Sequence, residues 1–407
     1  MPDSINEMTE QLTTENLLEA AQIYGTPLYV YNADRIKLQF KKLTDAFNSD
    51  KVRFFYASKA LTNISVLKVV NEMGCDVDCS SINEAKLALY AGFEPSKVLY
   101  TSNGIAFDEI EEAQSLGIHI NIDSLSNLEK FGKKFGGSYP VGIRLRPNIM
   151  AGGHIKISTG HEKSKFGIPV DQLEKIKELV EQHHLNISNL HIHTGSDIKD
   201  AEVFLKGVEV LFDLVPHFPN LKSIDLGGGF KVPYKDDDPS ININELATKV
   251  LAAFANNEAT KNLEIWFEPG KYLVSECGYF ITQVNVIKET PVTTFVSVNS
   301  GFNHLIRPMF YDAYHRVQNI SNPDGTPGEY TIVGNICETD TFAWDRNLPE
   351  IRENDLLVFY NAGAYGFEMS SNYNSRFKPA EVLFENGAHR LIRRRDEFED
   401  LLKGQVI

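Results

Sequence analysis

The stretch FFYASKALTN, residues 54–63, is an apolar, β-prone run that ends on small residues and then on Lys59. Lysines are almost never fully buried without a partner, so a lysine at the end of a buried strand needs a reason. A desolvated lysine loses its proton more readily and becomes a nucleophilic amine, which Schiff-base chemistry with an aldehyde cofactor requires. The stretch alone leaves a second interpretation open, in which Lys59 simply ends a strand and points to solvent.

The same pattern recurs along the chain from Val52, where short apolar runs end in small, polar or charged residues and a helix-like segment follows. The eight runs are VRFFYASK, CDVDCS, KVLYTS, IHINID, PVGIRLRP, SNLHIHTG, KSIDLGGG and LEIWFEPG. Strands that alternate with helices predict a parallel sheet with right-handed crossovers. Eight such strands favour an α/β protein with a closed (β/α)8 barrel over the alternative, an open doubly wound sheet.

The rhythm changes after Gly270, where β-like runs are separated by turns and show little helical spacing. These runs are YFITQVNVIKET, TTFVSVNS, YTIVGNI and DLLVFYNAGAYG, and they predict a mostly antiparallel β domain. We expect a barrel at residues 33–275, a C-terminal β domain at residues 276–407, and an N-terminal segment, residues 1–32, whose strand TPLYVYN packs with that β domain. The tail at residues 396–403 predicts a short polar helix.

An insertion at residues 148–167, rich in Gly, Lys, Ser and His, interrupts the barrel pattern between its fifth and sixth strands. A long loop without periodicity is usually functional or disordered, so a mobile lid and an ordinary surface loop both stay open.

Bulk properties exclude several classes of protein. The 407 residues carry a net charge of −15, which argues against non-specific binding to nucleic acid. The polar, acidic start is unlike a signal peptide, and no apolar run approaches the length of a membrane span. The four cysteines, Cys75, Cys79, Cys277 and Cys337, are too few for a disulfide framework in so long a chain, so we expect a cytoplasmic protein.

The ends of the predicted strands concentrate unusual residues on what would be one rim of the barrel, where active sites of this fold form. Gly227–Gly229 and the turn at Gly195-Ser196 could bring backbone N–H groups close to a phosphate. Glu268 could keep a heteroaromatic nitrogen protonated, and His193 could stack on the ring. Together with Lys59, these residues meet the needs of pyridoxal phosphate.

Other interpretations of these residues stay open. The pair His191-x-His193 could bind a metal, although we expect only one of the two side chains to point inward, and Glu268 could form a salt bridge with a helix end. Cys337 could be a proton donor or a structural cysteine. Arg307 and Lys271 could hold a carboxylate, Arg by a bidentate fork and Lys as a point charge.

Several segments, in this order, resemble the diaminopimelate decarboxylases, which belong to the fold-type III pyridoxal-phosphate decarboxylases. The segments are YASKA, HTGS, DLGGG, EPG, RPMFY, CETD and GAYGFEMSSNYNSR, and the similarity runs from about Gly25 to the C-terminus. CETD and YNSR favour this family over the related ornithine, arginine and carboxynorspermidine decarboxylases.

The resemblance implies a homodimer with shared active sites that converts meso-2,6-diaminopimelate to L-lysine and CO2, the last step of lysine biosynthesis. It implies that Lys59 bonds to the cofactor aldehyde and that Cys337, reaching over from the partner subunit, is the general acid. The implied cofactor contacts are Lys59, His193, Ser196, Gly227, Gly228, Gly229, Glu268, Pro269, Gly270, Lys271 and Tyr373. The implied substrate contacts are Lys271, Arg307, Tyr311, Glu338 and Tyr373. No metal is implied.

Two positions depart from the family pattern. Lys271 stands where the family usually has arginine after EPG, so the charge is kept but the fork is lost. Residues 79–84, CSSINE, replace the usual VSGGE, so we assign that turn no phosphate role.

Two rival functions remain. The first is decarboxylation of another basic amino acid such as ornithine, which lacks the distal carboxylate that Lys271 and Arg307 would hold. The second is a catalytically silent homologue that binds the cofactor.

Overall fold

The computed structural model describes residues 12–147, 164–235 and 237–406, and the chain forms two compact units. The barrel unit comprises Gln39–Val232 and Pro239–Tyr272. The β unit comprises Met1–Leu38, Pro233–Asp238 and Leu273–Ile407. Most of the 148–167 insertion lies outside the described residues, so both expectations for it stay predictions. None of the helices within the described ranges has the length and apolar character needed to cross a membrane.

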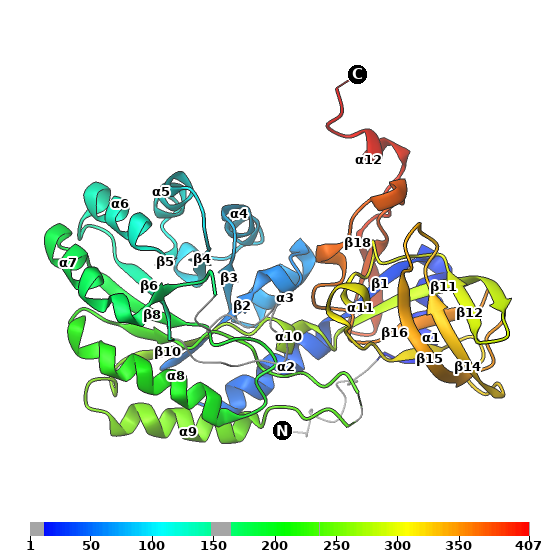
Figure 1. Cartoon of the computed structure of the whole chain (residues 1–407), viewed down its shortest axis with the longest axis horizontal. Coiled ribbons are helices and arrows are strands. Elements are labelled where there is room, and N and C mark those ends of the chain that lie inside the picture. Colours follow the sequence, from blue (N-terminus) through cyan, green and yellow to red (C-terminus); the bar gives the residue numbers. More distant parts are fainter. Residues whose placement is uncertain (1–11, 148–163, 236, 407) are drawn as a thin grey trace. The chain divides into compact units, whose positions relative to one another are not determined.

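Eight parallel strands form the core of the barrel unit (Figure 1). They are β2 (Val52–Ala57), β3 (Asp76–Cys79), β4 (Val98–Thr101), β5 (His119–Ile122), β6 (Val141–Arg146), β8 (Ile187–Ile192), β9 (Ser223–Asp225) and β10 (Glu264–Phe267). The first strand, β2, pairs with both β3 and the last strand, β10, so the sheet closes on itself. The predicted barrel is confirmed, and the open sheet is excluded. A two-residue strand, β7 (Ile168–Pro169), pairs with β6.

Helices surround these strands on the outside (Figure 1). They are α2 (Ala33–Phe47), α3 (Ile64–Glu72), α4 (Ile82–Tyr90), α5 (Phe107–Ser115), α6 (Leu125–Phe135), α7 (Leu173–His183), α8 (Ala201–Leu214) and α9 (Ile243–Asn256), with a short α10 (Lys271–Val274) after β10. Side-chain oxygens of Asn63, Ser81 and Ser124 accept N–H bonds at the starts of α3, α4 and α6, which explains where these helices begin. One-turn 3-10 helices occur at η1 (Ser58–Ala60), η2 (Pro95–Lys97), η4 (Val170–Gln172) and η5 (Val215–His217).

Aromatic packing fixes the strand that carries Glu268. Phe267, at the end of β10, is fully buried and lies 5.7 Å from the ring of Phe54 and 5.8 Å from that of Phe230. Aromatic side chains bury large apolar areas, so this cluster holds the ends of β2 and β10 in place. The next residue, Glu268, therefore lies at a fixed position on the rim.

The β unit contains a nine-stranded sheet that is mostly antiparallel, as predicted. Its strands are β1 (Leu28–Asn32), β11 (Gly278–Glu289), β12 (Thr294–Val298), β13 (Val317–Asn319), β14 (Pro327–Val333), β15 (Thr341–Pro349), β16 (Leu356–Phe359), β17 (Ala380–Glu385) and β18 (Ala388–Arg393). The remaining elements are α1 (Thr14–Tyr24), α11 (Arg307–Tyr311), α12 (Phe398–Leu402), η6 (Phe367–Met369) and η7 (Tyr373–Ser375). The helix α12 lies within the tail for which a short polar helix was predicted.

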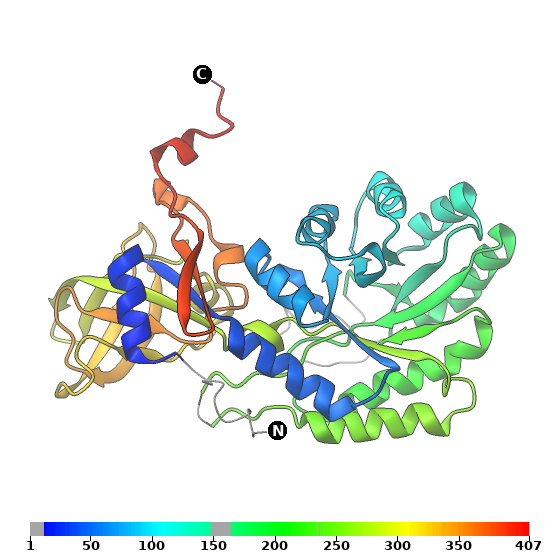
Figure 2. The same ribbon diagram turned by 180° about the vertical axis from the view of Figure 1, so that it is seen from behind.

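The N-terminal strand β1 lies between two strands from much later in the chain. It runs antiparallel to β11 and parallel to β17. The helix α1 covers this part of the sheet and buries Leu17 and Ala20 against Val382 and its neighbours (Figure 2). Residues from both ends of the sequence therefore share one hydrophobic core.

Candidate active site

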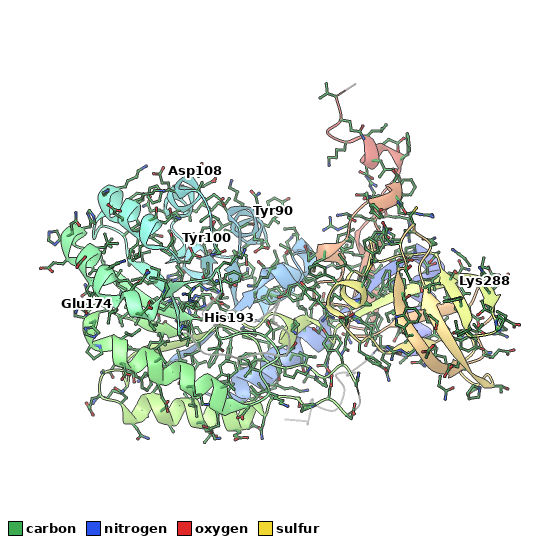
Figure 3. All side chains as sticks on the ribbon, in the orientation of Figure 1. Tyr90, Tyr100, Asp108, Glu174, His193 and Lys288 are labelled. Atoms are coloured by element: carbon green, nitrogen blue, oxygen red, sulfur yellow. The ribbon has the colours of Figure 1, made fainter. Side chains whose placement is uncertain are left out.

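The carboxyl ends of the barrel strands bring charged and titratable side chains together inside the barrel. Because all eight strands are parallel, these ends meet on one rim. The side chains that interact there are Lys59, Asp78, Arg144, His191, His193, Asp225 and Glu268. Figure 3 places His193 among the barrel strands, unlike Asp108 and Glu174 on the outer helices.

Lys59 lies on the one-turn helix η1, directly after β2, and 41% of its side chain is exposed. The prediction of a buried, desolvated lysine is therefore wrong, because the chain turns after Ala57 and leaves much of the Lys59 side chain in contact with solvent. The Lys59 Nζ atom lies 3.0 Å from Oδ2 of Asp78, which is almost fully buried. Beside this buried carboxyl group, Lys59 therefore carries an accessible amine, which an aldehyde can reach.

The turn that carries Lys59 is fixed by Glu84. The Ser58 hydroxyl donates to Glu84 Oε2 at 3.0 Å, and the Ser80 N–H donates to the same oxygen at 2.7 Å. Glu84 therefore ties the ends of β2 and β3 together. In this chain, the turn at residues 79–84 therefore supports Lys59. It does so without the paired glycines of the usual family segment VSGGE.

Asp78 was not identified from the sequence as a site residue. Burial and, after it, the nearby charge of Glu268 raise its pKa to about 7, against the opposing charge of Lys59. A carboxyl group with such a pKa can hold or release a proton beside the Lys59 amine near neutral pH. The available signal was the run DVD in a buried strand, since buried aspartates are rare without a partner.

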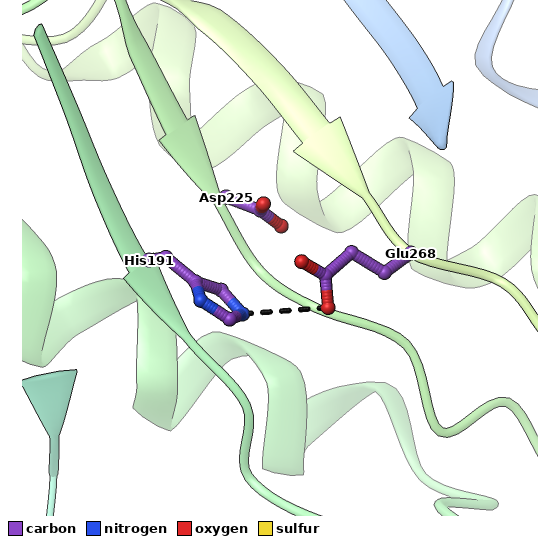
Figure 4. A group of neighbouring side chains, drawn as sticks. All are labelled: His191, Asp225 and Glu268. Atoms are coloured by element: carbon purple, nitrogen blue, oxygen red, sulfur yellow. Dashed lines mark ion pairs between the residues drawn. The ribbon is translucent and has the colours of Figure 1, made fainter. Parts of the chain in front are cut away.

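Glu268 is buried immediately after β10, beside His191 and Asp225 (Figure 4). Its Oε2 atom lies 3.4 Å from His191 Nε2. Burial alone would raise the pKa of Glu268, but His191, Lys59 and His193 outweigh burial and hold that pKa below its ordinary value. Glu268 is therefore a buried carboxylate, which suits a partner for a protonated ring nitrogen.

Asp225 was also not identified from the sequence, and its pKa is shifted in the opposite direction to that of Glu268. Burial and the charge of Glu268 raise the pKa of Asp225 well above its ordinary value, so Asp225 holds a proton and Glu268 is the anion of the pair. The ligand atoms of His191, Asp225 and Glu268 lie within 4.8 Å of one another. A metal would need both carboxylates ionised, which the proton on Asp225 opposes, so we assign no metal ligands here.

Both histidines of the His191-x-His193 pair face the interior, and the expectation that only one would do so is wrong. Side chains two residues apart along a strand lie on the same face, so His193 follows His191 inward. The His193 Nδ1 atom accepts the N–H of Gly228 at 3.3 Å. Burial and the charge of Arg144 lower the pKa of His193 to about 3, so its ring is neutral and suits stacking on an aromatic ring.

The glycine run after β9 is required by close packing. A Cβ atom on Gly227, where φ is 68°, would lie 2.6 Å from His193 Nδ1, and one on Gly229, where φ is 95°, would lie 2.0 Å from the Gly195 carbonyl oxygen. The Gly227 N–H already donates to Asp225 Oδ1 at 2.9 Å, and the Gly228 N–H is used by His193. A phosphate cradle here, which stays a prediction, would therefore rely on Gly229 and the Ser196 turn.

The segment EPGK is fastened to the end of β2 and to the Ser196 turn. The Pro269 carbonyl accepts the Ala57 N–H at 3.1 Å, and a Cβ on Gly270 would lie 3.2 Å from the Ala57 Cβ. The Lys271 Nζ atom lies 2.5 Å from Oδ1 of Asp197, the residue after Ser196. Lys271 is thus already paired with a carboxylate beside the predicted cradle.

In the β unit, the structure brings three of the predicted residues together. The Cys337 N–H donates to Asn374 Oδ1 at 3.1 Å, and the Tyr373 hydroxyl donates to a carboxylate oxygen of Glu338. Cys337 is exposed, and the Tyr373 side chain is 41% exposed while its ring stacks on Phe302. These loops therefore present a thiol, a carboxylate and a phenol on one surface of the unit.

Arg307 and Tyr311, on α11, form a second set. Arg307 is buried, and its Nη1 donates to the Tyr234 hydroxyl at 2.9 Å and lies 3.2 Å from His315 Nε2. His315 Nδ1 lies 2.8 Å from the Tyr360 carbonyl, so Nδ1 donates there and Nε2 accepts from Arg307. Burial lowers the pKa of His315 to about 3, which keeps this ring neutral.

The charge of Arg307 consequently meets only neutral partners. Among the described residues, no acidic side chain forms an ion pair with Arg307. A buried cation without a counter-charge is costly, so this position favours an incoming anion. Tyr311, half-buried on the same helix, packs against Phe310.

The barrel site has the chemistry that pyridoxal phosphate needs. Several buried polar atoms there lack a hydrogen-bond partner within the described ranges: Asp78 Oδ1, His191 Nδ1, Thr194 Oγ1, Asp225 Oδ2 and Glu268 Oε1. Buried polar groups are nearly always hydrogen-bonded in complete structures. An accessible lysine amine, a buried carboxylate and a neutral imidazole therefore fit a polar aromatic ligand.

Comparison with known proteins agrees with this geometry. The pyridoxal binding domain of the pyridoxal-dependent decarboxylases matches residues 33–275. The chain is 39% identical to diaminopimelate decarboxylase of Methanothermobacter thermautotrophicus, over 96% of this chain and 94% of that protein. It is 36% identical to the enzyme of that name from Pseudomonas aeruginosa, over 96% of this chain and 95% of the relative.

Solved structures give the same result. The crystal structure of diaminopimelate decarboxylase from Helicobacter pylori in complex with L-lysine superimposes with a TM-score of 0.88 at 33% identity, covering 96% of this chain and 98% of that one. The chain therefore belongs to the pyridoxal-dependent decarboxylases, and among them to the diaminopimelate decarboxylase family.

Proposed function

We propose that the protein converts meso-2,6-diaminopimelate to L-lysine and CO2 with pyridoxal phosphate as its cofactor. The observation that carries this proposal is the rim of the barrel, where the accessible amine of Lys59 shares a site with the buried carboxylate of Glu268 and the neutral ring of His193. The relatives named for this reaction support the substrate. When bound, pyridoxal phosphate supplies an aldehyde for covalent attachment and a protonated ring that withdraws electrons as CO2 leaves.

In the barrel unit, Lys59 is the residue for covalent attachment, and Asp78 can accept or return a proton at the Lys59 amine. Glu268 holds the ring nitrogen in its protonated form, and His193 stacks on the ring. Gly229 and the Ser196 turn, with Gly227 and Gly228 supporting them, would hold the phosphate. The ion pair of Lys59, the pKa directions of Asp78 and Glu268, and the Gly228–His193 hydrogen bond support these assignments.

Lys271 contributes a positive charge next to that turn. Its ion pair with Asp197 limits its freedom to bind an anion, since a partnered ammonium must first give up or share its carboxylate. We therefore assign Lys271 to cofactor binding in preference to substrate binding. Pro269 and Gly270 act by fixing its position against β2.

In the β unit, we assign the distal end of the substrate to Arg307, Tyr311 and Glu338. Arg307 is suited to the distal carboxylate because its guanidinium lies between neutral groups. Glu338 is suited to the distal ammonium. The Tyr373 hydroxyl fixes one oxygen of Glu338 and can also contact the cofactor phosphate.

We further propose that the protein acts as a homodimer and that Cys337 donates the proton to the substrate carbon in the partner's site. The exposed thiol of Cys337 and the large exposed side chains of Met309, Phe310 and Tyr373 support an interface on the β unit. A cytoplasmic location fits the four free cysteines.

The test is an assay of the purified, cofactor-loaded chain with meso-diaminopimelate, L-ornithine and L-lysine at equal concentrations. We expect CO2 and L-lysine from meso-diaminopimelate alone, because the other two amino acids lack the distal carboxylate that Arg307 would hold. Release of CO2 from ornithine at a comparable rate would contradict meso-diaminopimelate as the specific substrate and would favour the decarboxylation of another basic amino acid. No CO2 from any of them, with the cofactor bound, would indicate a silent homologue.

A further inference from the structure

Asp225 and Glu268 face each other from neighbouring strands. Asp225 ends β9, and it pairs in register with Trp266 of β10, two residues before Glu268. Both carboxyl groups are buried, Asp225 completely and Glu268 to 7% exposure. Figure 4 shows the two groups on the same side of the sheet, with the His191 ring beside Glu268. The mechanism uses Glu268 directly but gives no function to Asp225.

The hydrogen bonds around this pair are incomplete in a specific way. Asp225 Oδ1 accepts the Gly227 N–H at 2.9 Å, whereas Asp225 Oδ2 has no partner among the described residues. On the other side, Glu268 Oε1 also has none. Two carboxylates this close in a buried site cannot both be ionised, and one proton between them resolves both deficits.

The surrounding charges decide which carboxyl group keeps that proton. The other titratable or charged groups that act on the pair are Lys59, Asp78, Arg144, His191 and His193. Glu268 is adjacent to His191 and feels the charge of Lys59, which favours its ionised form. The pKa of Asp225 is raised first by burial and then by the charges of Glu268 and Asp78, which favours its neutral form.

We propose that Asp225 is a positioning residue whose neutral carboxyl group keeps Glu268 as the single anion of the pair and orients it toward the cofactor's ring nitrogen. This inference rests on the proposed function, because it assigns a task to Asp225 only when Glu268 faces that nitrogen. The neutral state of Asp225 is what keeps the charge of the pair on Glu268.

Asparagine and alanine at position 225 distinguish a neutral hydrogen-bond donor to Glu268 from an anion at this position. In Asp225→Asn, the side-chain oxygen can still accept the Gly227 N–H, and the amide can donate to Glu268 where the carboxyl proton did. We expect this variant to bind pyridoxal phosphate within about twofold of the wild type and to keep its visible absorbance, because a neutral donor replaces a neutral donor. Asp225→Ala removes the donor, and we expect cofactor affinity to fall by roughly tenfold to a hundredfold, the range seen when groups that orient a ligand-binding side chain are removed.

Asp76→Asn is the matched control. Asp76 is a second buried aspartate of the barrel, but it starts β3 and pairs with Arg53 at 2.7 Å. We expect this variant to lose stability without any change in cofactor affinity or absorbance. If Asp225→Asn lowers cofactor affinity and Asp76→Asn does not, the loss is specific to position 225 and is not a general result of removing a buried aspartate from the barrel.

Infrared spectroscopy tests the proton without using activity. At a pH above about 7, where Asp78 is ionised, the wild-type minus Asp225→Asn difference spectrum should contain the C=O band of a neutral carboxylic acid. The corresponding difference with Asp76→Asn should lack that band. This measurement also stands if Asp225→Ala does not fold.

The outcomes separate this inference from the proposed function. If the wild type binds pyridoxal phosphate but Asp225→Asn weakens binding as much as Asp225→Ala does, Asp225 acts as an anion and the inference is overturned while the function stands. A difference spectrum without the carboxylic acid band overturns it as well. If the wild type does not bind the cofactor, the proposed function fails and the assignment to Asp225 fails with it.

Discussion

The rim of the barrel and the surface loops of the β unit hold their reactive side chains in opposite environments. On the rim, Asp225, Glu268 and His191 are buried. Glu268 raises the pKa of Asp225, and His191 lowers the pKa of Glu268. In the loops, Cys337 and Tyr373 are exposed and are held by hydrogen bonds with their neighbours. The barrel therefore sets the electrostatics of its buried groups within one chain, whereas the loops leave the Cys337 thiol and the Tyr373 side chain exposed.

The largest effect is expected at Lys59. Lys59→Ala removes the only group that we assign to covalent attachment, so turnover should fall below detection and the visible absorbance of protein-bound cofactor should disappear. The fold should persist, because the side chain is 41% exposed. Absorbance and thermal unfolding measure these two results.

Lys51→Ala is its control. Lys51 precedes β2 at the other end of that strand and donates to the Lys261 carbonyl at 2.6 Å. Turnover and absorbance should stay at wild-type levels. If Lys59→Ala keeps the absorbance of bound cofactor, Lys59 is not the residue that attaches the cofactor.

The next effect is expected at Cys337, in the loops. Cys337→Ala should slow turnover by about 10²- to 10⁴-fold, the usual contribution of a positioned proton donor, and should leave cofactor binding and stability unchanged. Cys75→Ala is the control, because Cys75 is buried and its thiol donates to the Phe54 carbonyl at 3.2 Å. That variant should lose stability and keep its turnover.

Mixing two inactive variants sharpens the same comparison. If Cys337 serves the partner's barrel, subunits of Lys59→Ala and Cys337→Ala should together recover about a quarter of wild-type activity, since half of the random dimers would hold one intact site. Activity that stays at the level of the separate variants would show that each site is built from one chain.

A smaller effect is expected at Arg307. Arg307→Gln should lower kcat/KM for meso-diaminopimelate by about 1.5–3 kcal/mol of transition-state binding, the range for hydrogen bonds to charged groups. Arg307→Lys should recover part of this loss. Arg316→Gln is the control, because the Arg316 guanidinium stacks over the Tyr360 ring. Equal losses in the two glutamine variants would contradict the assignment.

The pH dependence of stability should have opposite signs in the two units. The pKa of His315, in the β unit, is about 3 in the folded state and 6.5 ordinarily, so the unfolded state takes up a proton that the folded state refuses. Its contribution to stability should fall as the pH drops from 6.5 toward 3, by about 1.4 kcal/mol per pH unit.

Asp78, in the barrel unit, should act the other way. Its pKa is about 7 in the folded state and 3.8 ordinarily, so its contribution is complete below 3.8 and is lost as the pH rises through 7. The free energy of unfolding of His315→Gln and Asp78→Asn, measured between pH 4 and 8, checks both signs. Slopes that change in the same direction in both variants would refute the contrast.

The sequence predicted the barrel well because its signal is repeated eight times. Strands of the β unit were harder to predict: β13, β15, β17 and β18 were missed. The outer strand β18 contains His389, Arg390 and Arg393, and its side chains are largely exposed, so it lacks an apolar alternation. A strand with that composition is specified by its neighbour and not by its own pattern.

The site shows the same division between local and non-local information. Lys59, His193 and Glu268 follow directly from strand ends that local sequence reveals. Asp78 and Asp225 lie within buried runs, and only the pairing of neighbouring strands brings them near Lys59 and Glu268. The exposure of Lys59 could not be predicted either, because it depends on the direction of the single turn η1.

The position of β1 also determines when the β unit can be completed during synthesis. Leu28 of β1 pairs with Ala380 of β17, roughly 350 residues later in the chain. At about 5–20 residues per second, the first strand waits on the order of 20 to 70 s for this neighbour to leave the ribosome. All eight strands of the barrel are made within that interval, so the barrel can form while the N-terminal strand is still without its parallel partner.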